Sequence, residues 1–493
     1  MSLKRDKFLL AISFLIAAAV FAGAGSILWR YFTGSRSDLS SSSTPIATEK
    51  VTPTSIQSRL SSGERILSHQ EGDAKKPAFE QAKNEGVKAI AAKKYVLAAE
   101  KLRSALSIYP NAPETLIYLN NTWISEDEKT YTIAVSTPLD DKQDGLAVLR
   151  GVAQAQKEIN ESGGINGIRL KVLVADDDNQ GAVAQQIASE LAKKPEVLGV
   201  IGHFSSSTTL AAKEAYDREK LPAISSSSSS VELSKKDYVF RTVPNDASTA
   251  SALAEYMLNT LKRQKVAVFF NDAPQSSYSR SLSSTLIREV EQNNGNVVAQ
   301  FDFSKANFDP AESVKQATQS GAEVLMLAAS SDDFSDVYKV IESNNGQLEL
   351  LGGDELYNIK MLQNDEVKDF GKFSTNMVVG AVWDSLVTPD PKNGDSEFNL
   401  RAEQLWQGKV NWFTAMAYDA TKVFAEAIKR DPSREGIHKV LSDTNFSTPG
   451  ASRPIQFTSE GDRIGKVNLF QVKSGSSPRY SSKTGYDFIP IDP

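Results

Sequence analysis

The chain has 493 residues, of which 40% are hydrophobic and 24% charged, a composition typical of a soluble globular protein with about three domains. It contains no cysteine and only three histidines, which excludes disulfides, thiolate metal sites and cysteine nucleophiles and disfavours a multi-histidine metal site. The formal net charge of −6 and the lack of a basic tract argue against nucleic acid as the main partner.

Residues 1–34 are expected to be a membrane anchor or a signal segment. A basic cluster at residues 4–7 precedes an uncharged apolar stretch over residues 8–29, long enough to span the hydrocarbon core of a bilayer as a helix. Aromatic residues follow, as at a membrane interface, so we expect a retained single span with the rest of the chain outside the cytoplasm. A cleaved signal is the alternative, because small residues at positions 22–24 offer a cleavage site.

Residues 35–76 are expected to be a linker, because a segment with a serine run at residues 40–43 and few apolar residues supplies no core. Residues 77–122 then show apolar and small residues at helical spacing. Pro110 ends the second expected helix and Pro113 opens the next. These features predict a helical hairpin.

The hairpin segment GVKAIAAKKYVLAAEKLRSALSIYPNAPETLIYL resembles one tetratricopeptide repeat and the start of another. Small residues at Gly86, Ala89 and Ala98 let the two helices approach closely. One repeat cannot bury its own apolar face, so the hairpin must lean on the next domain or on a partner protein. A plain helical spacer is the alternative.

Strands and helices alternate from residue 131 onward, which predicts a doubly wound α/β sheet with helices on both faces. A second series of the same kind begins near residue 247, which predicts two lobes with a ligand cleft beyond the carboxyl ends of their strands. The expected strands are residues 131–139, 168–177, 197–204, 221–226, 265–272, 296–303 and 323–329. The expected helices are residues 146–159, 181–192, 208–219, 247–261 and 278–292, with another from residue 310.

Two serine-rich loops follow expected strands. Ser205, Ser206 and Ser207 lie where a helix begins, and free backbone N–H groups and hydroxyls there can bind a carboxylate or phosphate. A simple serine N-cap is the alternative. The run Ser225–Ser230 either lines the cleft with hydroxyls and carbonyls or is a flexible linker.

Acidic residues follow other strands. Asp354 comes after two glycines that allow close backbone approach, and opposite an anion site it would pair with an ammonium group. A helix cap is the alternative. The acidic run Asp176–Asp178 is interpreted as a solvated loop and helix cap, and His203 as a packed loop histidine.

Several fragments carry a family resemblance through their order and spacing: INESGGINGIRLKVLVADDD, VIGHFSSSTT, AYDREKLPAISSSSSSVEL, VFRTVPND, AMAYDATKVFAEAI and IQFTSEGDRIGKVNLFQV. The segment from Tyr131 onward resembles the type I periplasmic binding proteins of the leucine/isoleucine/valine-binding group. The resemblance implies a binding domain at residues 128–493, made of two Rossmann-like lobes joined by a hinge. Lobe 1 would comprise residues 128–246 and 384–454, and lobe 2 residues 247–383 and 455–493.

The resemblance also implies the roles of individual residues. Ser206, flanked by Ser205 and Ser207, matches the serine that holds a substrate carboxylate. Ser227 and Ser229 match residues of the second serine loop that contact the amino acid. Tyr278 matches an aromatic residue that closes over the ligand, and Asp354 the acidic residue that receives the ammonium group. The family tyrosine after LMLAA is replaced here by Ser330 or its neighbours, so branched-chain specificity does not follow.

Together these features predict an extracytoplasmic substrate-binding protein that delivers an amino acid or a related small amide to an ABC permease. It would act without a cofactor, either tethered to the bacterial cytoplasmic membrane or free in the periplasm if the N-terminal segment is cleaved. The alternative is a membrane-tethered ligand sensor or scaffold with the same fold. An enzyme is not expected, because the sequence has no GxSxG elbow, Cys–His pair or HExxH motif.

Overall fold

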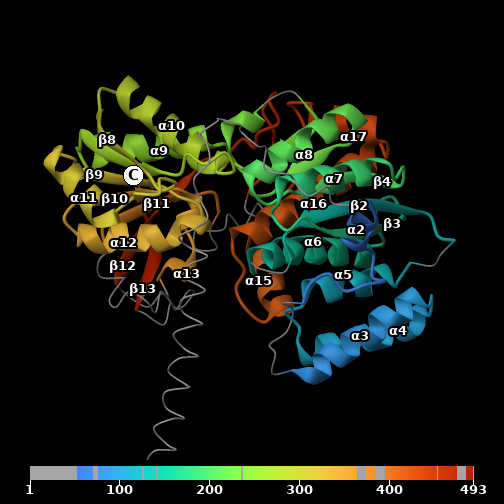
Figure 1. The fold of residues 1–493 in the computed structure, drawn as a ribbon. Helices are drawn as coiled ribbons and strands as arrows, with labels where there is room; N and C mark the ends of the chain where they lie inside the picture. The colour runs from blue at the N-terminus through green and yellow to red at the C-terminus, as the bar shows by residue number, and fades with distance from the viewer. Residues whose placement is uncertain are drawn as a thin grey trace, which may run out of the picture. The chain divides into compact units, whose positions relative to one another are not determined.

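Two sheets form the frame of the protein, as the computed structural model shows (Figure 1). All described residues belong to the unit Val51–Pro493. The described residues are 53–69, 71, 76–124, 127–139, 143–234, 237–362, 374–383, 395–451, 453–474 and 485–491.

The expected membrane span at residues 8–29 lies outside the described residues. Among the helices that are described, each is too short or too polar to cross a bilayer. The retained span and the cleaved signal are therefore both still predictions.

The first sheet has six strands in the order β1-β3-β2-β4-β5-β6. Neighbouring strands are parallel, except that β1 runs antiparallel to β3. The apolar runs in the sequence form these strands because a parallel sheet covered on both faces buries both sides of each strand. The strands are β1 (Leu60–Ser61), β2 (Thr130–Thr137), β3 (Arg169–Asp176), β4 (Val197–Ile201), β5 (Ala223–Ser225) and β6 (Val239–Arg241).

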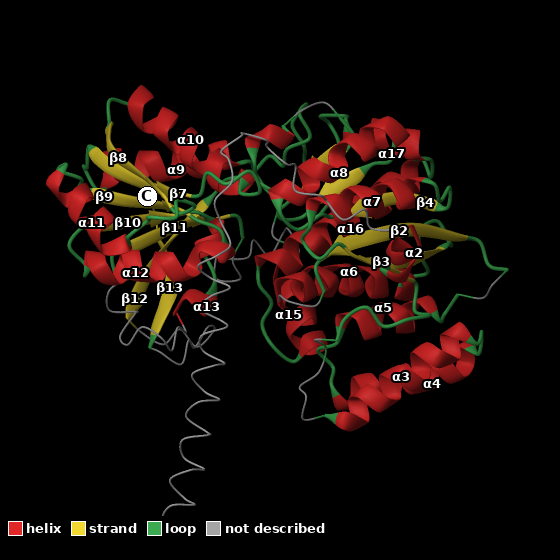
Figure 2. Ribbon diagram, in the orientation of Figure 1, coloured by secondary structure: helices red, strands yellow, loops and turns green. Residues whose placement is uncertain are grey.

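Helices cover both faces of the first sheet (Figure 2). One face packs against α6 (Gln143–Glu161) and α16 (Trp412–Arg430), and the other against α7 (Gly181–Ala192) and α8 (Ser206–Glu219). A Cβ added at Gly151 of α6 would lie 2.2 Å from the Thr414 carbonyl oxygen of α16, so glycine permits this close helix contact. The remaining helices of this lobe are α15 (Asp395–Trp406) and α17 (Arg434–Leu441).

The second sheet has seven strands in the order β13-β12-β11-β10-β9-β7-β8. Five are parallel, and the antiparallel strands β12 and β13 extend the sheet at one edge, which the alternating pattern did not predict. The strands are β7 (Lys265–Phe270), β8 (Asn296–Asp302), β9 (Val324–Ala328), β10 (Glu349–Gly352), β11 (Met377–Ala381), β12 (Asn468–Ser474) and β13 (Tyr486–Ile491).

Helices also cover both faces of the second sheet. On one face pack α9 (Asp246–Glu255), which continues as a π-helical turn (Tyr256–Thr260), and α10 (Ser277–Gln292). On the other pack α11 (Pro310–Gln319), α12 (Phe334–Asn344) and the short α13 (Ile359–Leu362). Single 3-10 turns follow three strands, at Val231–Leu233, Ser331–Asp333 and Asp354–Leu356. The expected doubly wound architecture of two α/β units is confirmed.

Part of the expected linker is folded. The helix α2 (Pro53–Ser58) precedes β1, which adds to the edge of the first sheet with Leu60 opposite Ala175. Ile56 and Leu60 are buried in the cluster beneath α7. The expectation of a linker throughout residues 35–76 therefore fails here, because two isolated apolar residues in a polar segment gave no periodic signal.

The N-terminal helices are α3 (Pro77–Ala91), α4 (Tyr95–Ile108) and α5 (Pro113–Asn121). Gly86 lets α3 and α4 approach, because a Cβ at this position would lie 2.7 Å from the Leu102 side chain. Leu102 and Ile117 share a hydrophobic cluster with Leu149 of α6. The hairpin thus packs against the first lobe, while its likeness to a tetratricopeptide repeat is still a prediction.

A buried ionic network ties the N-terminal segment to this hairpin. Lys83 Nζ lies 2.9 Å from Glu71 Oε2 and 2.8 Å from Glu114 Oε2, and donates to the Ser68 carbonyl at 2.9 Å. Glu114 Oε1 also accepts the Leu67 N–H at 2.8 Å. Burial alone would lower the pKa of Lys83, but the charges of Glu114 and Glu71 raise it above its ordinary value. Lys83 therefore stays charged and holds two buried carboxylates together.

Replacing Lys83 by methionine should lower the free energy of unfolding of the hairpin, because the substitution leaves two buried carboxylates without their cation. We expect a loss of about 3–5 kcal/mol, the usual cost of removing one partner from a buried ion pair. Urea unfolding and amide exchange over residues 77–121 measure the effect. Lys101→Met is the matched control, since its ion pair with Glu85 on the same hairpin is exposed. Equal destabilisation by both substitutions would contradict this account of the network.

Candidate ligand-binding site between the two sheets

A cavity of about 420 Å³ lies among loops at the carboxyl ends of strands from both sheets. This volume is within the range of about 300–1,000 Å³ that is usual for small-molecule sites. Loops after β3, β4 and β5 line it from the first lobe, and loops after β7, β9 and β10 from the second. Of the seven predicted site residues, Ser205, Ser206, Ser207, Ser227 and Tyr278 line this cavity.

The loop after β4 places two serines at the start of α8. Ser205 is the N-cap residue, and its hydroxyl accepts the Thr208 N–H at 3.2 Å, so the capping interpretation holds for this serine. Ser206 is buried, and its Oγ accepts the N–H of Ser230 at 3.2 Å. The first turn of α8 therefore presents its backbone N–H groups and the Ser206 hydroxyl at the cavity wall.

A few hydroxyl contacts join the two lobes. Ser207 Oγ accepts the Ser277 N–H at 3.1 Å, and Ser277 Oγ lies 3.0 Å from Ser230 Oγ. The Val231 N–H donates to Ser281 Oγ at 2.9 Å. These bonds connect the serine loops of the first lobe to α10 of the second, and each of them is a neutral hydrogen bond.

The run Ser225–Ser230 is buried throughout. Ser225 Oγ donates to the His203 carbonyl at 2.9 Å, and Ser227 Oγ donates to the Phe204 carbonyl at 2.6 Å. The flexible-linker interpretation of this run is therefore wrong. Short hydroxyl side chains instead fasten one loop of the cavity wall to the other.

Tyr278 connects the cavity to Asp354, which lies behind it. The Tyr278 hydroxyl donates to Asp354 Oδ1 at 2.7 Å, and Asp354 is 2% exposed and does not line the cavity itself. A Cβ at Gly353 would lie 2.2 Å from the Tyr278 hydroxyl, so glycine is needed for this approach, as the sequence indicated. Burial raises the pKa of Asp354 to about 6.

Asp246 is a second buried carboxylate, which the sequence analysis did not select. It follows the N-cap Asn245 of α9 and is 1% exposed. Burial and the charge of nearby Asp354 raise its pKa to about 7, while the hydroxyls of Ser281 and Ser229 and the charge of Arg241 oppose this rise. An aspartate at a helix start is usually a simple cap, so its sequence context did not indicate an interaction with another carboxylate.

Asp246 Oδ2 and Ser229 Oγ make no hydrogen bond of ordinary length and angle with a described residue, although the Ser229 hydroxyl lies close enough to lower the pKa of Asp246. Like Asp354, Ser229 is buried and is not part of the cavity wall. A buried carboxylate pair with unpaired acceptor oxygens is stabilised by a cation that carries several N–H donors. An ammonium group has this chemistry.

His203 is packed in its loop as expected, with partners that the sequence did not reveal. Its Nδ1 lies 2.6 Å from Asp177 Oδ2 and its Nε2 lies 2.8 Å from the Tyr216 hydroxyl. Asp177 is fully buried, and Asp176 is nearly so and pairs with Arg59 at 2.9 Å. The expectation of a solvated acidic loop is wrong for these two aspartates, because neighbouring donors pair with both carboxylates.

The raised carboxyl pKa values predict that the ligand-free protein loses stability as pH rises. Between about pH 4 and pH 7 the folded state binds more protons at Asp246 and Asp354 than the unfolded chain does, so unfolding becomes easier with rising pH. Asp246→Asn should remove part of this pH dependence. The change in the free energy of unfolding across the window should shrink by up to a few kcal/mol, at about 1.4 kcal/mol per pKa unit. Urea unfolding across this pH range measures it.

Asp302→Asn is a control of opposite sign. Burial would raise the pKa of Asp302, but hydrogen bonds from Asp272 and Ser304 lower it to about 2. The free energy of unfolding that Asp302 contributes is fully present across the same pH window. This variant should therefore shift the curve of stability against pH without changing its slope there. A curve for Asp246→Asn that runs parallel to that of the unmodified protein would refute the buried-acid interpretation.

Comparisons with known proteins place this geometry in a family. The family model described as periplasmic binding protein matches residues 130–477. The leucine-specific-binding protein of Salmonella typhimurium is 24% identical over 354 residues, which cover 70% of this chain and 90% of the relative. An amino acid binding protein of Pseudomonas aeruginosa is 30% identical over 178 residues, which cover 36% of this chain and 47% of the relative.

The fold also matches solved structures. A crystal structure of a leucine binding protein from Thermotoga maritima aligns with a TM-score of 0.62 at 21% identity, covering 74% of this chain and 99% of that protein. At this identity the structural match supports the fold alone. Because the family model covers well over half of the sequence, the chain belongs to the periplasmic binding proteins, with the type I fold.

Proposed function

We propose that this protein captures a free amino acid or a related small amide between its lobes and delivers it to an ABC transporter. The observation that carries the proposal is the buried pair Asp246 and Asp354, where Asp246 Oδ2 has no hydrogen-bond partner among the described residues. The charge of Arg241 reaches Asp246, but Arg241 is itself paired with Asp462 at 2.6 Å. A ligand ammonium supplies a cation that contacts both carboxylates. It shares Asp354 with the Tyr278 hydroxyl and donates to Asp246 Oδ2 and Ser229 Oγ.

The ligand carboxylate binds on the first lobe. The start of α8 offers backbone N–H groups and the Ser206 hydroxyl, which are suited to an anion at a helix N-terminus. Hydroxyl and carbonyl groups of the loop around Ser227 supply further hydrogen bonds. An acid-binding wall and a cation-binding pair near one cavity match the two charged ends of an α-amino acid.

The cavity favours a polar ligand side chain. Its wall beyond the serine loops includes Asn179, Gln275, Ser330, Asp332 and Glu355, and no lysine or arginine among the described residues lines it. A leucine side chain would displace water from these polar groups without offering them a hydrogen bond, at a cost in binding free energy. We therefore propose a hydroxyl- or amide-bearing amino acid, although the relatives are named for leucine.

Closure of the lobes over the ligand precedes its delivery to the permease. Each contact between the serine loops and α10 is a neutral hydrogen bond, so these bonds alone favour the closed form only weakly. A ligand that contacts both lobes shifts the equilibrium towards closure. The closed form is then presented to the permease, outside the cytoplasm and tethered by the N-terminal segment.

A thermal-shift screen of the full chain tests the ligand class. Asparagine, glutamine, serine and threonine should raise the melting temperature more than leucine, isoleucine and valine, because ligand binding stabilises the folded state by mass action. Short amides and urea extend the series. Preferential stabilisation by leucine would refute the polar-pocket argument while leaving amino-acid binding intact.

Asp354→Ala should weaken binding of the best ligand from that screen. Losing one carboxylate leaves the ammonium incompletely paired in the closed cleft, which costs roughly 2–5 kcal/mol, the usual penalty for a truncated buried charge pair. Isothermal titration calorimetry measures the loss. Glu312→Gln, which removes an exposed carboxylate of the same lobe, is the control. If Asp354→Ala binds as tightly as the unmodified protein, the ammonium site lies elsewhere.

A further inference from the structure

Two described segments of the chain cross between the lobes and lie against each other. The first crossing, residues 242–245, joins β6 of the first sheet to α9 of the second lobe. The return crossing, residues 458–467, leads back from the core of the first lobe to β12. The Arg241 N–H donates to the Gly461 carbonyl at 3.0 Å, which joins the two segments. A hinge motion of the lobes therefore involves both crossings.

Buried ion pairs fasten the return crossing on two sides. Arg241 Nε, at the end of β6, donates to Asp462 Oδ1 at 2.6 Å, and these side chains are 2% and 7% exposed. The next residue, Arg463, pairs with Asp419 of α16 at 2.5 Å. Arg463 also donates to the Thr242 carbonyl at 3.0 Å. The return crossing is thus held both to the first crossing and to the first lobe.

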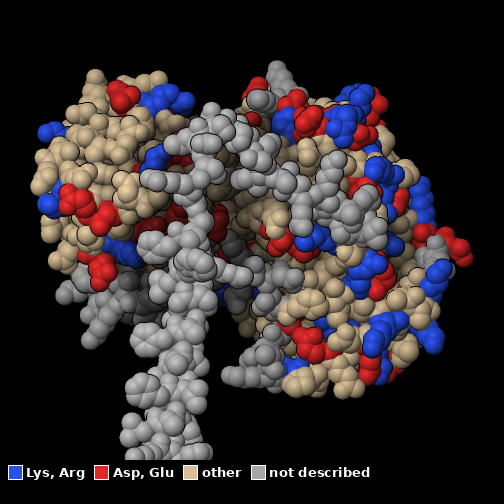
Figure 3. Space-filling view, viewed as in Figure 1, with Lys and Arg blue, Asp and Glu red and all other residues tan. Residues whose placement is uncertain are grey.

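A buried ion pair differs from the pairs on the surface. Figure 3 shows basic and acidic side chains interspersed over the described part of one face, where water screens their interaction. Burying Arg241 and Asp462 instead removes both charges from water, at a cost that apolar side chains of similar size would avoid. Stability alone therefore does not account for this pair, and its remaining contacts lead to the ligand site.

Arg241 connects the ion pair to the serine run at residues 225–230. Its Nη1 donates to the Ser230 carbonyl at 2.6 Å and to the Ser228 carbonyl at 3.4 Å. A guanidinium group can make these contacts together because it carries five N–H donors in a fixed plane. Its charge also lowers the pKa of Asp246, against the larger effect of burial. Arg241 thus acts on the ligand site through both hydrogen bonds and charge.

Asp462 connects the same ion pair to the start of α9. Its Oδ2 accepts the side-chain amide of Asn245 at 2.7 Å, and Asn245 is the N-cap residue of α9. Asp246 follows directly, and its N–H donates to the Ser229 carbonyl at 2.8 Å. One ion pair therefore holds the two segments that place Asp246 and Ser229.

The groups that act on the Asp246 carboxyl group come from four elements. They are Asp354 of the 3-10 turn, Tyr278 and Ser281 of α10, Ser229 of the serine run and Arg241 of β6. Arg241 is the cation of this set, and its pairing with Asp462 offsets part of the positive charge that Asp246 experiences. Removing Arg241 and removing Asp462 should therefore have opposite effects on Asp246.

We propose that Arg241 and Asp462 are positioning residues of the ligand site, which hold Asp246 beside Ser229 for the ligand ammonium and set the pH at which Asp246 becomes charged. This inference rests on the proposed function, because it assigns Asp246 to the ammonium group. Since the same ion pair joins the two crossings, it also links the hinge to the cation site.

Substitutions on the two sides of the ion pair should shift the titration of Asp246 in opposite directions. Arg241→Gln removes the nearby cation, so Asp246 should lose its proton at a pH higher by about half a unit or more. Asp462→Asn leaves Arg241 without its counter-ion, so Asp246 should titrate at a lower pH than in the unmodified protein. Carbon-13 NMR of the ligand-free full chain with labelled aspartate measures both shifts, and Asp246→Asn identifies the signal. Any other order of the three titrations would overturn the proposal.

A double variant covers the case in which a single substitution prevents folding. Arg241→Gln combined with Asp462→Asn leaves neither member of the pair as an unpaired buried charge. Because the cation is absent, Asp246 should again titrate at a higher pH than in the unmodified protein. An unchanged or lower titration in the double variant would count against the proposal.

Arg241→Lys separates position from charge. Lysine keeps the positive charge but lacks the planar set of donors, so the pH dependence of amino-acid affinity should persist. The affinity itself should fall about tenfold at each pH, as when residues that orient metal ligands are replaced. Calorimetry with the best amino acid from the thermal-shift screen measures both quantities. Unchanged affinity in this variant would reject the positioning role.

Arg434→Lys is the matched control. Arg434 is a half-buried arginine of the first lobe that donates to the carbonyls of Ala192, Lys194 and Val197, away from the crossings. This variant should keep amino-acid affinity within about twofold of the unmodified protein, as expected for a distant site. A loss equal to that of Arg241→Lys would also reject the positioning role.

The titrations need no ligand, so this inference and the proposed function can fail separately. If the three titrations follow the expected order but the unmodified protein binds no amino acid, the proposed function is rejected and the coupling of the ion pair to Asp246 is retained. If amino acids bind but the order differs, the proposed function stands and the role of Arg241 and Asp462 is rejected.

Discussion

The enclosure of Asp246 and Asp354 is the constraint on which the ligand-binding account depends. Burial deprives both carboxylates of hydration and raises both pKa values, and the charge of Asp354 raises that of Asp246 further. The Tyr278 hydroxyl, which bonds Asp354, is neutral, and Arg241, whose charge reaches Asp246, is already paired with Asp462. In the proposed complex the ligand amino group supplies the cation that pairs with both carboxylates.

The serine loops determine how this enclosure can open. Within the first lobe, Ser225 and Ser227 bond to backbone carbonyls of the neighbouring loop, so the wall around the cavity is a connected unit. Between the lobes, contacts such as that of Ser207 with Ser277 are neutral bonds at the surface of each half. Breaking them exposes groups that water can satisfy, whereas breaking the internal bonds would disrupt the wall. Opening at the lobe boundary is thus the less costly motion.

Local patterns made the fold and part of the site predictable. Apolar runs and helical spacing located the parallel strands, and the ends of those strands located Ser206 and the serine run that contains Ser227. Tyr278 followed only from the family resemblance. Features that depend on distant residues were missed. Asp246 has the sequence context of an ordinary helix cap, and its importance arises only when the fold brings it near Asp354. Likewise, nothing near Leu60 in the sequence shows that β3 offers it a free edge.

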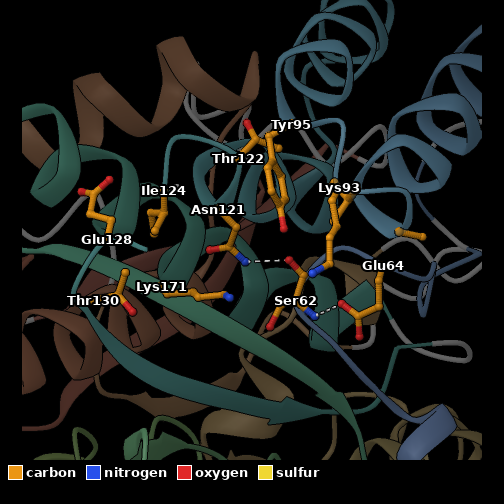
Figure 4. Close-up of a pocket in the computed structure, with 12 residues that line it drawn as sticks. Ser62, Glu64, Lys93, Tyr95, Asn121, Thr122, Ile124, Glu128, Thr130 and Lys171 are labelled. Carbon is orange, nitrogen blue, oxygen red and sulfur yellow. Dashed lines mark hydrogen bonds between the residues drawn. The ribbon is translucent and has the colours of Figure 1, made fainter. Parts of the chain in front are cut away.

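The amino and carboxyl ends of the first sheet meet different parts of the molecule. At the carboxyl ends, the loops after β3, β4 and β5 line the candidate ligand cavity. At the amino ends, Thr130 and Lys171 meet the N-terminal helices around a second cavity of about 540 Å³ (Figure 4). The network around Lys83 holds these helices in place, so this second cavity depends on a buried ion pair far from the cleft. Because β3 runs from Lys171 at the second cavity to the loop that lines the candidate ligand cavity, this strand connects the walls of the two cavities.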